Sequence, residues 1–147
     1  MRRLAACCAA LMFASACSPG LPVDEYDFDP AATKTCEALY ADAPQTVAGQ
    51  ARRSVGDDRA LAWGDNAITL RCGVPKPQGL TRSSRCDFVA DVGWFTSKGS
   101  QSYTFTTIGR EVFVSVEVPR SYDPAADILV DLAAVVVQHD PVVTPCV

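Results

Sequence analysis

Histidine is the scarcest ionisable residue of this 147-residue chain, with a single copy at His139. One histidine and no Cys-x-x-Cys pair leave no ligand set at metal-binding spacing, so we expect no metal and no cofactor. The hydrolase signatures G-x-S-x-G, S-x-x-K and H-E-x-x-H are also missing, and the sequence identifies no catalytic residue. Basic residues are outnumbered, 13 against 17 acidic ones, which argues against a nucleic-acid partner. These absences favour a role other than catalysis.

Long hydrophobic runs are lacking as well. The run at residues 4–16, which follows Arg2 and Arg3, has 13 uncharged residues. A membrane-spanning helix needs about 20 residues, whereas a run of this length suits a secretory signal. The run ends Ala14-Ser15-Ala16 before Cys17, which fits cleavage after a small residue and resembles a bacterial lipobox. Ala14 stands where a lipobox usually carries leucine.

The sequence therefore predicts a signal peptide over residues 1–16 and lipidation of Cys17. The lipid would hold the exported protein on the outer face of the cytoplasmic membrane. A plain secreted protein and an uncleaved anchor are the open alternatives. Residues 18–29 are rich in proline and acidic side chains, and we expect residues 17–29 to form an extended, solvated tether. Tyr26 and Phe28 within it are expected to pack on the domain, a docking motif for a partner being the alternative.

Cysteine, in contrast, is plentiful, with seven copies. Two of them, Cys7 and Cys8, belong to the predicted signal. The four that follow Cys17 form an even set, which in an oxidising compartment indicates two disulfides. Of the three pairings, the sequence favours Cys72–Cys86 with Cys36–Cys146, since the first would close a proline-containing loop and the second would tie the ends of the domain.

The remaining chain, residues 30–147, fits one domain of α+β class. Asp29-Pro30 and Asp123-Pro124 are good helix starts, because each offers an acceptor followed by proline. The first helix is expected to reach Pro44. Residues 45–58 are expected to be extended, with room for one short strand, and residues 60–64 to form one turn that buries Trp63.

Alternation predicts four strands: residues 67–72, 86–95, 102–108 and 111–118. Gly109-Arg110 suggests a two-residue hairpin turn that sets Phe105 opposite Val114. The expected fold is a two-layer sandwich, in which a four-stranded antiparallel meander carries the N-terminal and C-terminal helices on one face. The two tryptophans, Trp63 and Trp94, are expected in the core.

A basic segment, residues 71–85, spans the second cysteine of this domain and ends just before the third. It contains no acid, and its cations are Arg71, Lys76, Arg82 and Arg85. Arginine forks and the neighbouring Ser83 and Ser84 suit an anionic envelope polymer or an acidic patch of an envelope protein, while a solvated loop is the alternative. A cell-envelope hydrolase acting on wall glycan or peptide is the second functional hypothesis, and it would require a cleft that gathers Asp91, Arg85 and Ser84.

Several segments resemble an actinobacterial lipoprotein family known as domain of unknown function 3515. They are CEALYADAPQTVAGQARRSV, ALAWGDNAITLRCGVPKP, CDFVADVGWF and FTTIGREVFVSVEVP, which together cover about residues 34–120. The resemblance implies an envelope lipoprotein with disulfides, no assigned reaction and no agreed site residues. With the signal segment and the tether, it predicts an exported, lipid-anchored binding or assembly module.

Overall fold

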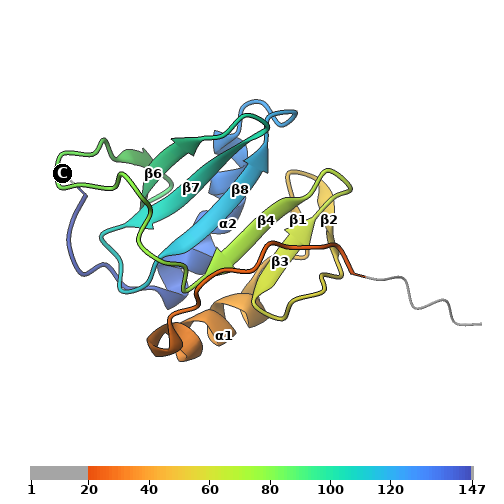
Figure 1. The fold of residues 1–147 in the computed structure, drawn as a ribbon, viewed down its shortest axis with the longest axis horizontal. Helices are drawn as coiled ribbons and strands as arrows, with labels where there is room; N and C mark the ends of the chain where they lie inside the picture. Colours follow the sequence, from red (N-terminus) through yellow and green to blue (C-terminus); the bar gives the residue numbers. More distant parts are fainter. Residues whose placement is uncertain (1–19, 147) are drawn as a thin grey trace, which may run out of the picture.

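The predicted α+β class is confirmed, but the sheet is twice as large as expected. A computed structural model describes residues 20–146, so the predicted signal peptide and Cys17 lie outside the described residues. It contains the helices α1 (Thr33–Asp42) and α2 (Ala126–His139), a 3-10 turn (Pro30–Ala32) and eight strands (Figure 1). The strands are β1 (Thr46–Val47), β2 (Gln50–Arg53), β3 (Ala60–Trp63), β4 (Ile68–Cys72), β5 (Asp87–Val89), β6 (Val92–Lys98), β7 (Ser102–Ile108) and β8 (Val114–Pro119).

The strands form one antiparallel sheet in the order β1-β2-β3-β4-β8-β7-β6-β5. The predicted meander is therefore wrong in one step, because β4 pairs with the last strand, β8, instead of the next strand along the chain. Residues 73–86 cross to the far edge of the sheet, and β5 to β8 then return strand by strand to β4 (Figure 1).

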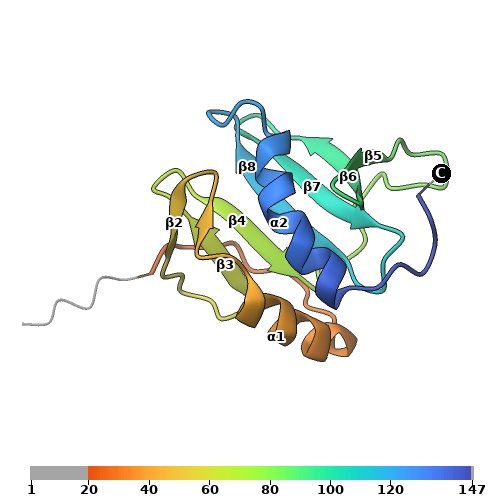
Figure 2. The same ribbon diagram turned by 180° about the vertical axis from the view of Figure 1, so that it is seen from behind.

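Both helices lie on one face of the sheet, as predicted, with α1 beside α2 (Figure 2). The core lies between this layer and the sheet. Trp63 and Trp94 are both fully buried there, as expected. We call the opposite side, which no helix covers, the open face; the segment 20–29 and the 73–86 loop run across parts of it (Figure 1).

Two tight turns explain the extra strands. Ala48-Gly49 joins β1 to β2, and Ala90-Asp91 joins β5 to β6, all four residues having positive φ. Two consecutive positive φ angles give the turn that matches the twist of a two-residue hairpin. Residues 86–95, predicted as one strand, are therefore a hairpin, and Phe88 is 64% exposed instead of buried. Residues 60–63, predicted as a turn, form β3.

The hairpin of β7 and β8 keeps its predicted faces but shifts its register by two residues. Phe105 pairs with Val116, not Val114, and the connection runs over residues 109–113. A shift of two leaves every side chain on its own face, because the period of a strand is two. The side chain of Arg110, predicted in the turn, is buried and donates to the backbone oxygens of Asp140 and Asp91.

The two predicted helix starts differ in outcome. Asp29 caps the first helical turn as expected, its Oδ1 accepting from the Ala31 N–H at 2.9 Å. The second helix begins later than predicted, at Ala126, with no side-chain cap hydrogen bond. The helix buries one face, made by Ile128, Leu129, Leu132, Ala133, Val135 and Val136.

The described part of the predicted tether, residues 20–29, runs along the domain and is bonded to it, with its acidic side chains exposed. The Leu21 N–H donates to Ser54 O at 2.9 Å, and Leu21 O accepts from the Gly56 N–H at 3.1 Å. Phe28 packs so closely on Gly73 that a Cβ there would lie 2.7 Å from its ring. The expectation that Tyr26 and Phe28 pack on the domain is confirmed, and we call residues 20–29 the N-terminal arm.

Candidate binding surface

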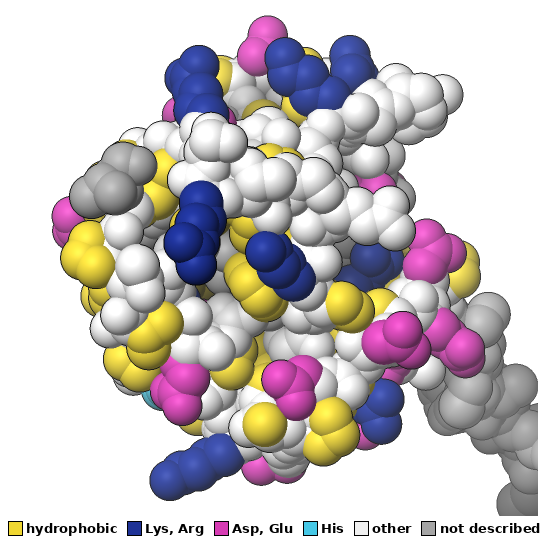
Figure 3. Space-filling model, turned by 60° about the vertical axis from the view of Figure 1, so that its left-hand side comes forward, with side chains coloured by type: hydrophobic (Ala, Val, Ile, Leu, Met, Phe, Trp, Pro, Cys, Tyr) yellow, Lys and Arg dark blue, Asp and Glu magenta, His cyan; other side chains and the backbone are white. Residues whose placement is uncertain are grey.

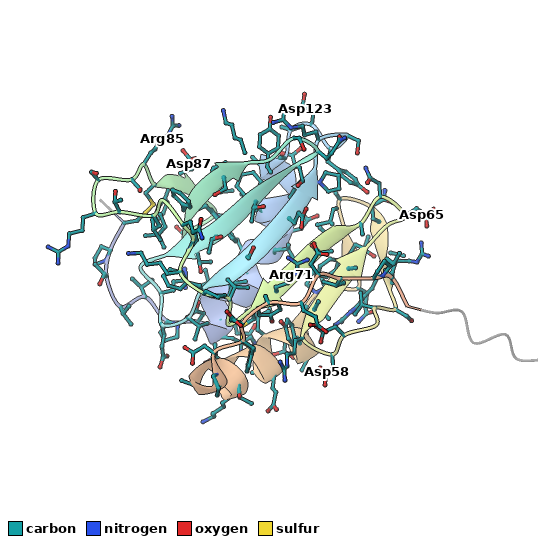
Figure 4. All side chains as sticks on the ribbon, in the orientation of Figure 1. Asp58, Asp65, Arg71, Arg85, Asp87 and Asp123 are labelled. Atoms are coloured by element: carbon teal, nitrogen blue, oxygen red, sulfur yellow. A yellow bond between two sulfur atoms is a disulfide. The ribbon has the colours of Figure 1, made fainter. Side chains whose placement is uncertain are left out.

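The four basic residues proposed for anion binding do not form one patch. Arg71 lies on β4 at the open face, with Glu117 Oε2 3.9 Å from its Nη2 atom. Arg85 pairs directly with Asp87, 2.6 Å from Nε to Oδ1. Lys76 and Arg82 are exposed in the 73–86 loop. Basic side chains on this side of the molecule are mostly separated by uncharged ones (Figure 3), and Arg71 and Arg85 are far apart (Figure 4).

Hydrogen bonds hold both ends of the 73–86 loop. The N–H groups of Gly73 and Val74 both donate to Phe113 O, at 2.9 and 3.1 Å, which fixes the start of the loop against the sheet. Near its end, the Thr81 N–H donates to Ser84 Oγ at 2.9 Å. The loop therefore presents Lys76 and Arg82 from a defined backbone.

The number of disulfides is as predicted, but the favoured pairing is wrong. The bridges are Cys36–Cys72 and Cys86–Cys146, with Cα–Cα distances of 5.4 and 6.2 Å. The first joins α1 to β4 inside the core. The second ties the sheet edge to the C-terminal segment, so the two ends of the 73–86 loop belong to different bridges. The pairing depends on the path of that loop to the far edge, which the expected meander did not include.

The cleft required by the hydrolase hypothesis is not formed among the described residues. Ser84 and Arg85 line a hollow of about 420 Å³ together with Asp87 and Lys98. Asp91 lies at another hollow of about 150 Å³, beside Phe88 and the Cys86–Cys146 bridge. The three residues that the hydrolase hypothesis requires are thus divided between two hollows.

His139 also has a partner that the sequence did not indicate. Its Nε2 atom lies 2.8 Å from Asp42 Oδ2, which links the end of α2 to the end of α1. This hydrogen bond joins the ends of the two helices and gives His139 a structural role.

Two tyrosine hydroxyl groups meet beneath the N-terminal arm. Tyr26 and Tyr40 both donate to Arg59 O, Tyr26 at 3.0 Å. The Cys72 N–H donates to the Tyr40 hydroxyl at 2.8 Å. Burial raises the pKa of both hydroxyl groups, most strongly that of Tyr40. Both hydroxyl groups therefore stay neutral. Their hydrogen bonds attach the arm and α1 to the start of β3 and the end of β4.

The largest of these hollows, about 740 Å³, lies between this arm and residues 56–59. It is lined by Glu25, Asp57 and Asp58 together with Arg59. No group of three or more potential metal ligands occurs within residues 20–146. In the same part of the chain, no helix is long and apolar enough to cross a bilayer.

The sequence did not indicate Glu117 as the neighbour of Arg71 on the open face. Glu117 pairs with Thr69 across β8 and β4 and lies diagonal to Arg71. Only the adjacency of β4 and β8 brings these residues together, and that adjacency follows from the crossing of the 73–86 loop. The one signal in the sequence is the alternation of residues 111–118, which sets Glu117 on the face opposite Val114 and Val116.

Comparisons with known proteins give a family without an assigned activity. No curated protein and no solved structure matches the chain. The family model described as "Protein of unknown function (DUF3515)" matches residues 4–143, which is nearly the whole chain. The chain therefore belongs to this family of unknown function.

Proposed function

We propose that the protein is an exported, lipid-anchored component of the cell envelope that acts by binding or assembly. The observation that carries the proposal is the use of all four cysteines after Cys17 in two disulfides. Such bridges persist in oxidising compartments outside the cytoplasm and are rare inside it. The basic n-region, the short apolar run and the small residues before Cys17 supply the matching export signal.

The N-terminal arm would hold an anchored domain close to the membrane. Cys17 lies three residues before Gly20, a span of at most about 11 Å. From Leu21 onward the arm is bonded to the loop between β2 and β3. An anchor at Cys17 would therefore keep this end at the lipid headgroups. The C-terminal end and the far part of the 73–86 loop lie at the opposite side of the molecule and would face a partner (Figure 1).

Fatty-acid labelling tests the anchor. Cells expressing the full chain are fed an alkyne fatty acid, and the protein is compared as wild type, Cys17→Ala and Cys8→Ala. We expect label in the membrane fraction for wild type and for Cys8→Ala, which keeps the acceptor thiol. Cys17→Ala should carry none, because it lacks the sulfur that receives the lipid. Equal labelling of the three proteins, or none in wild type, contradicts the anchor.

A further inference from the structure

Arg71 is a half-buried cation whose hydrogen-bonding capacity is largely unused. Its side chain is 17% exposed, and its Nε atom is buried without a hydrogen-bond partner among residues 20–146. The carboxylate of Glu117 lies 3.9 Å from Nη2, beyond the distance of a direct hydrogen bond. Because Ile68, Leu70 and Cys72 face the core, the alternation of β4 directs Arg71 to the open face (Figure 4).

Several other arginines of the domain donate hydrogen bonds from their guanidinium groups. Their acceptors lie at hydrogen-bond distance: Tyr40 O for Arg52, Asp87 for Arg85, Asp91 O for Arg110 and Gly99 O for Arg120. A buried donor without an acceptor costs about 1–3 kcal/mol. An apolar side chain at position 71 would avoid that cost. The stability of the fold therefore does not by itself explain an arginine at this position.

The gap between Arg71 and Glu117 has the size of one hydroxyl group. An oxygen about 2.8 Å from both Nη2 and Oε2 closes a 3.9 Å separation with an angle of roughly 90° at that oxygen. This oxygen would accept from the guanidinium and donate to the carboxylate. An anion would fit poorly, because the like charge of Glu117 opposes it at this distance.

The residues around the gap also suit a ligand rich in hydroxyl groups. Glu117 Oε1 accepts from Ser102 Oγ at 2.8 Å, which leaves Oε2 for another donor. Strand register brings further hydroxyl side chains to the same face: Thr69, Ser97, Thr104, Thr106 and Ser115. The Oγ1 atom of Thr69 is buried without a partner, like Nε of Arg71. Thr69, Thr106 and Ser115 are buried. The part of this face that a ligand can reach therefore lies around Glu117 and the partly exposed residues Ser97, Ser102 and Thr104.

From this arrangement we infer that Arg71 and Glu117 form a binding site for a sugar hydroxyl group of a neutral glycan. A sugar ring carries hydroxyl groups that each accept and donate, as the gap requires, and it brings no charge next to Glu117. The inference deepens the proposed function by naming the ligand class. It concerns the folded domain, so its test does not depend on the lipid at Cys17.

Binding to defined glycans tests the inference. The full chain is titrated in detergent with dextran and with chitotetraose, and the Nε–H signal of Arg71 is followed by NMR. We expect that signal to shift on titration with at least one of these sugars. Arg71→Gln and Glu117→Gln should each weaken binding at least tenfold, because each removes one side of the hydroxyl bridge.

The matched control is the exposed pair Arg53–Asp65, whose side chains are in direct contact. Arg53→Gln and Asp65→Asn make the same chemical changes away from the open face and should leave the affinity within about twofold. Thermal unfolding verifies that all four variants are folded; if Arg71→Gln is not, Glu117→Gln alone decides.

Several results would overturn the inference. If neither sugar moves the Arg71 signal, water alone fills the gap. Variants at 71 and 117 that bind like wild type would place the glycan elsewhere. Binding of polygalacturonate or polyglutamate but of neither neutral sugar, strengthened by Glu117→Gln, would show an anion site instead. None of these results bears on fatty-acid labelling, so this inference and the proposed anchor can fail separately.

Discussion

Asp140, directly after α2, is a carboxyl group with no solvent exposure. Its Oδ1 atom accepts from the Val112 N–H at 3.1 Å, while Oδ2 is buried without a partner. Burial raises the pKa of Asp140 to about 6, although the Val112 N–H and the Arg110 charge pull it down. Folding therefore favours the protonated form of this side chain between about pH 4 and pH 6.

The stability of the fold should consequently depend on pH through Asp140. Between about pH 4 and pH 6 the folded state keeps a proton that the unfolded state has released, so the contribution of this group falls as pH rises through that window. From pH 5 to pH 7 the loss amounts to about 1 kcal/mol. Asp140→Asn removes the titration and keeps an acceptor for Val112.

Urea unfolding of wild type and Asp140→Asn at pH 5 and pH 7 measures this effect. The wild-type free energy of unfolding should fall by about 1 kcal/mol more than that of the variant between the two pH values. Parallel changes in the two proteins would show that Asp140 titrates normally in the folded state.

At the scale of elements, the tight turns decide where strands begin and end. Ala90 and Asp91 have φ angles of 47° and 65°, in the left-handed region. For a residue with a Cβ this conformation costs roughly 1 kcal/mol, and asparagine tolerates it better than alanine. Ala90 thus occupies a position that a hairpin would ordinarily give to asparagine or glycine.

Replacing this alanine should stabilise the β5–β6 hairpin. Ala90→Asn is expected to raise the free energy of unfolding by about 0.5–1 kcal/mol, since the side chain is exposed and only the backbone preference changes. Ala51→Asn, at an exposed position of β2, is the control and should be neutral or destabilising because asparagine is disfavoured in strands. Chemical denaturation compares the variants; equal effects at both positions would contradict the turn argument.

These turns also show why the sequence predicted only part of the fold. Periodicity assigned faces well: Ile68, Leu70 and Cys72 are buried, and Glu117 is on the open face. It could not reveal the Ala90-Asp91 turn, because neither residue is the glycine or asparagine that signals a hairpin. Periodicity could not predict the order of the strands either. The disulfide pairing and the contact of Arg71 with Glu117 both depend on that order, so they could not be predicted.

At the scale of the whole molecule, the two disulfides differ in their access to solvent. Cys36 and Cys72 are 2% and 0% exposed, and Cys36 lines a small hollow together with Phe28 of the arm. Cys86 and Cys146 are partly exposed at the sheet edge. Thiol–disulfide exchange requires a thiolate to reach a sulfur atom, so access controls which bridge reacts first. The outer bridge also closes a longer loop, with a sequence separation of 60 against 36.

Limited reduction should therefore open Cys86–Cys146 before Cys36–Cys72. With dithiothreitol under native conditions, followed by alkylation and peptide mass spectrometry, we expect Cys86 and Cys146 to be modified first. The fold should survive this step, because Val143 and Thr144 still donate to Gly109 O at 2.8 and 3.0 Å and hold the C-terminal segment. Phe28→Ala provides the sharpest control: it uncovers the inner bridge and should speed the alkylation of Cys36 and Cys72 alone. Simultaneous modification of all four cysteines in wild type would instead mean that reduction follows global unfolding, and that neither the arm nor the core shields the inner bridge.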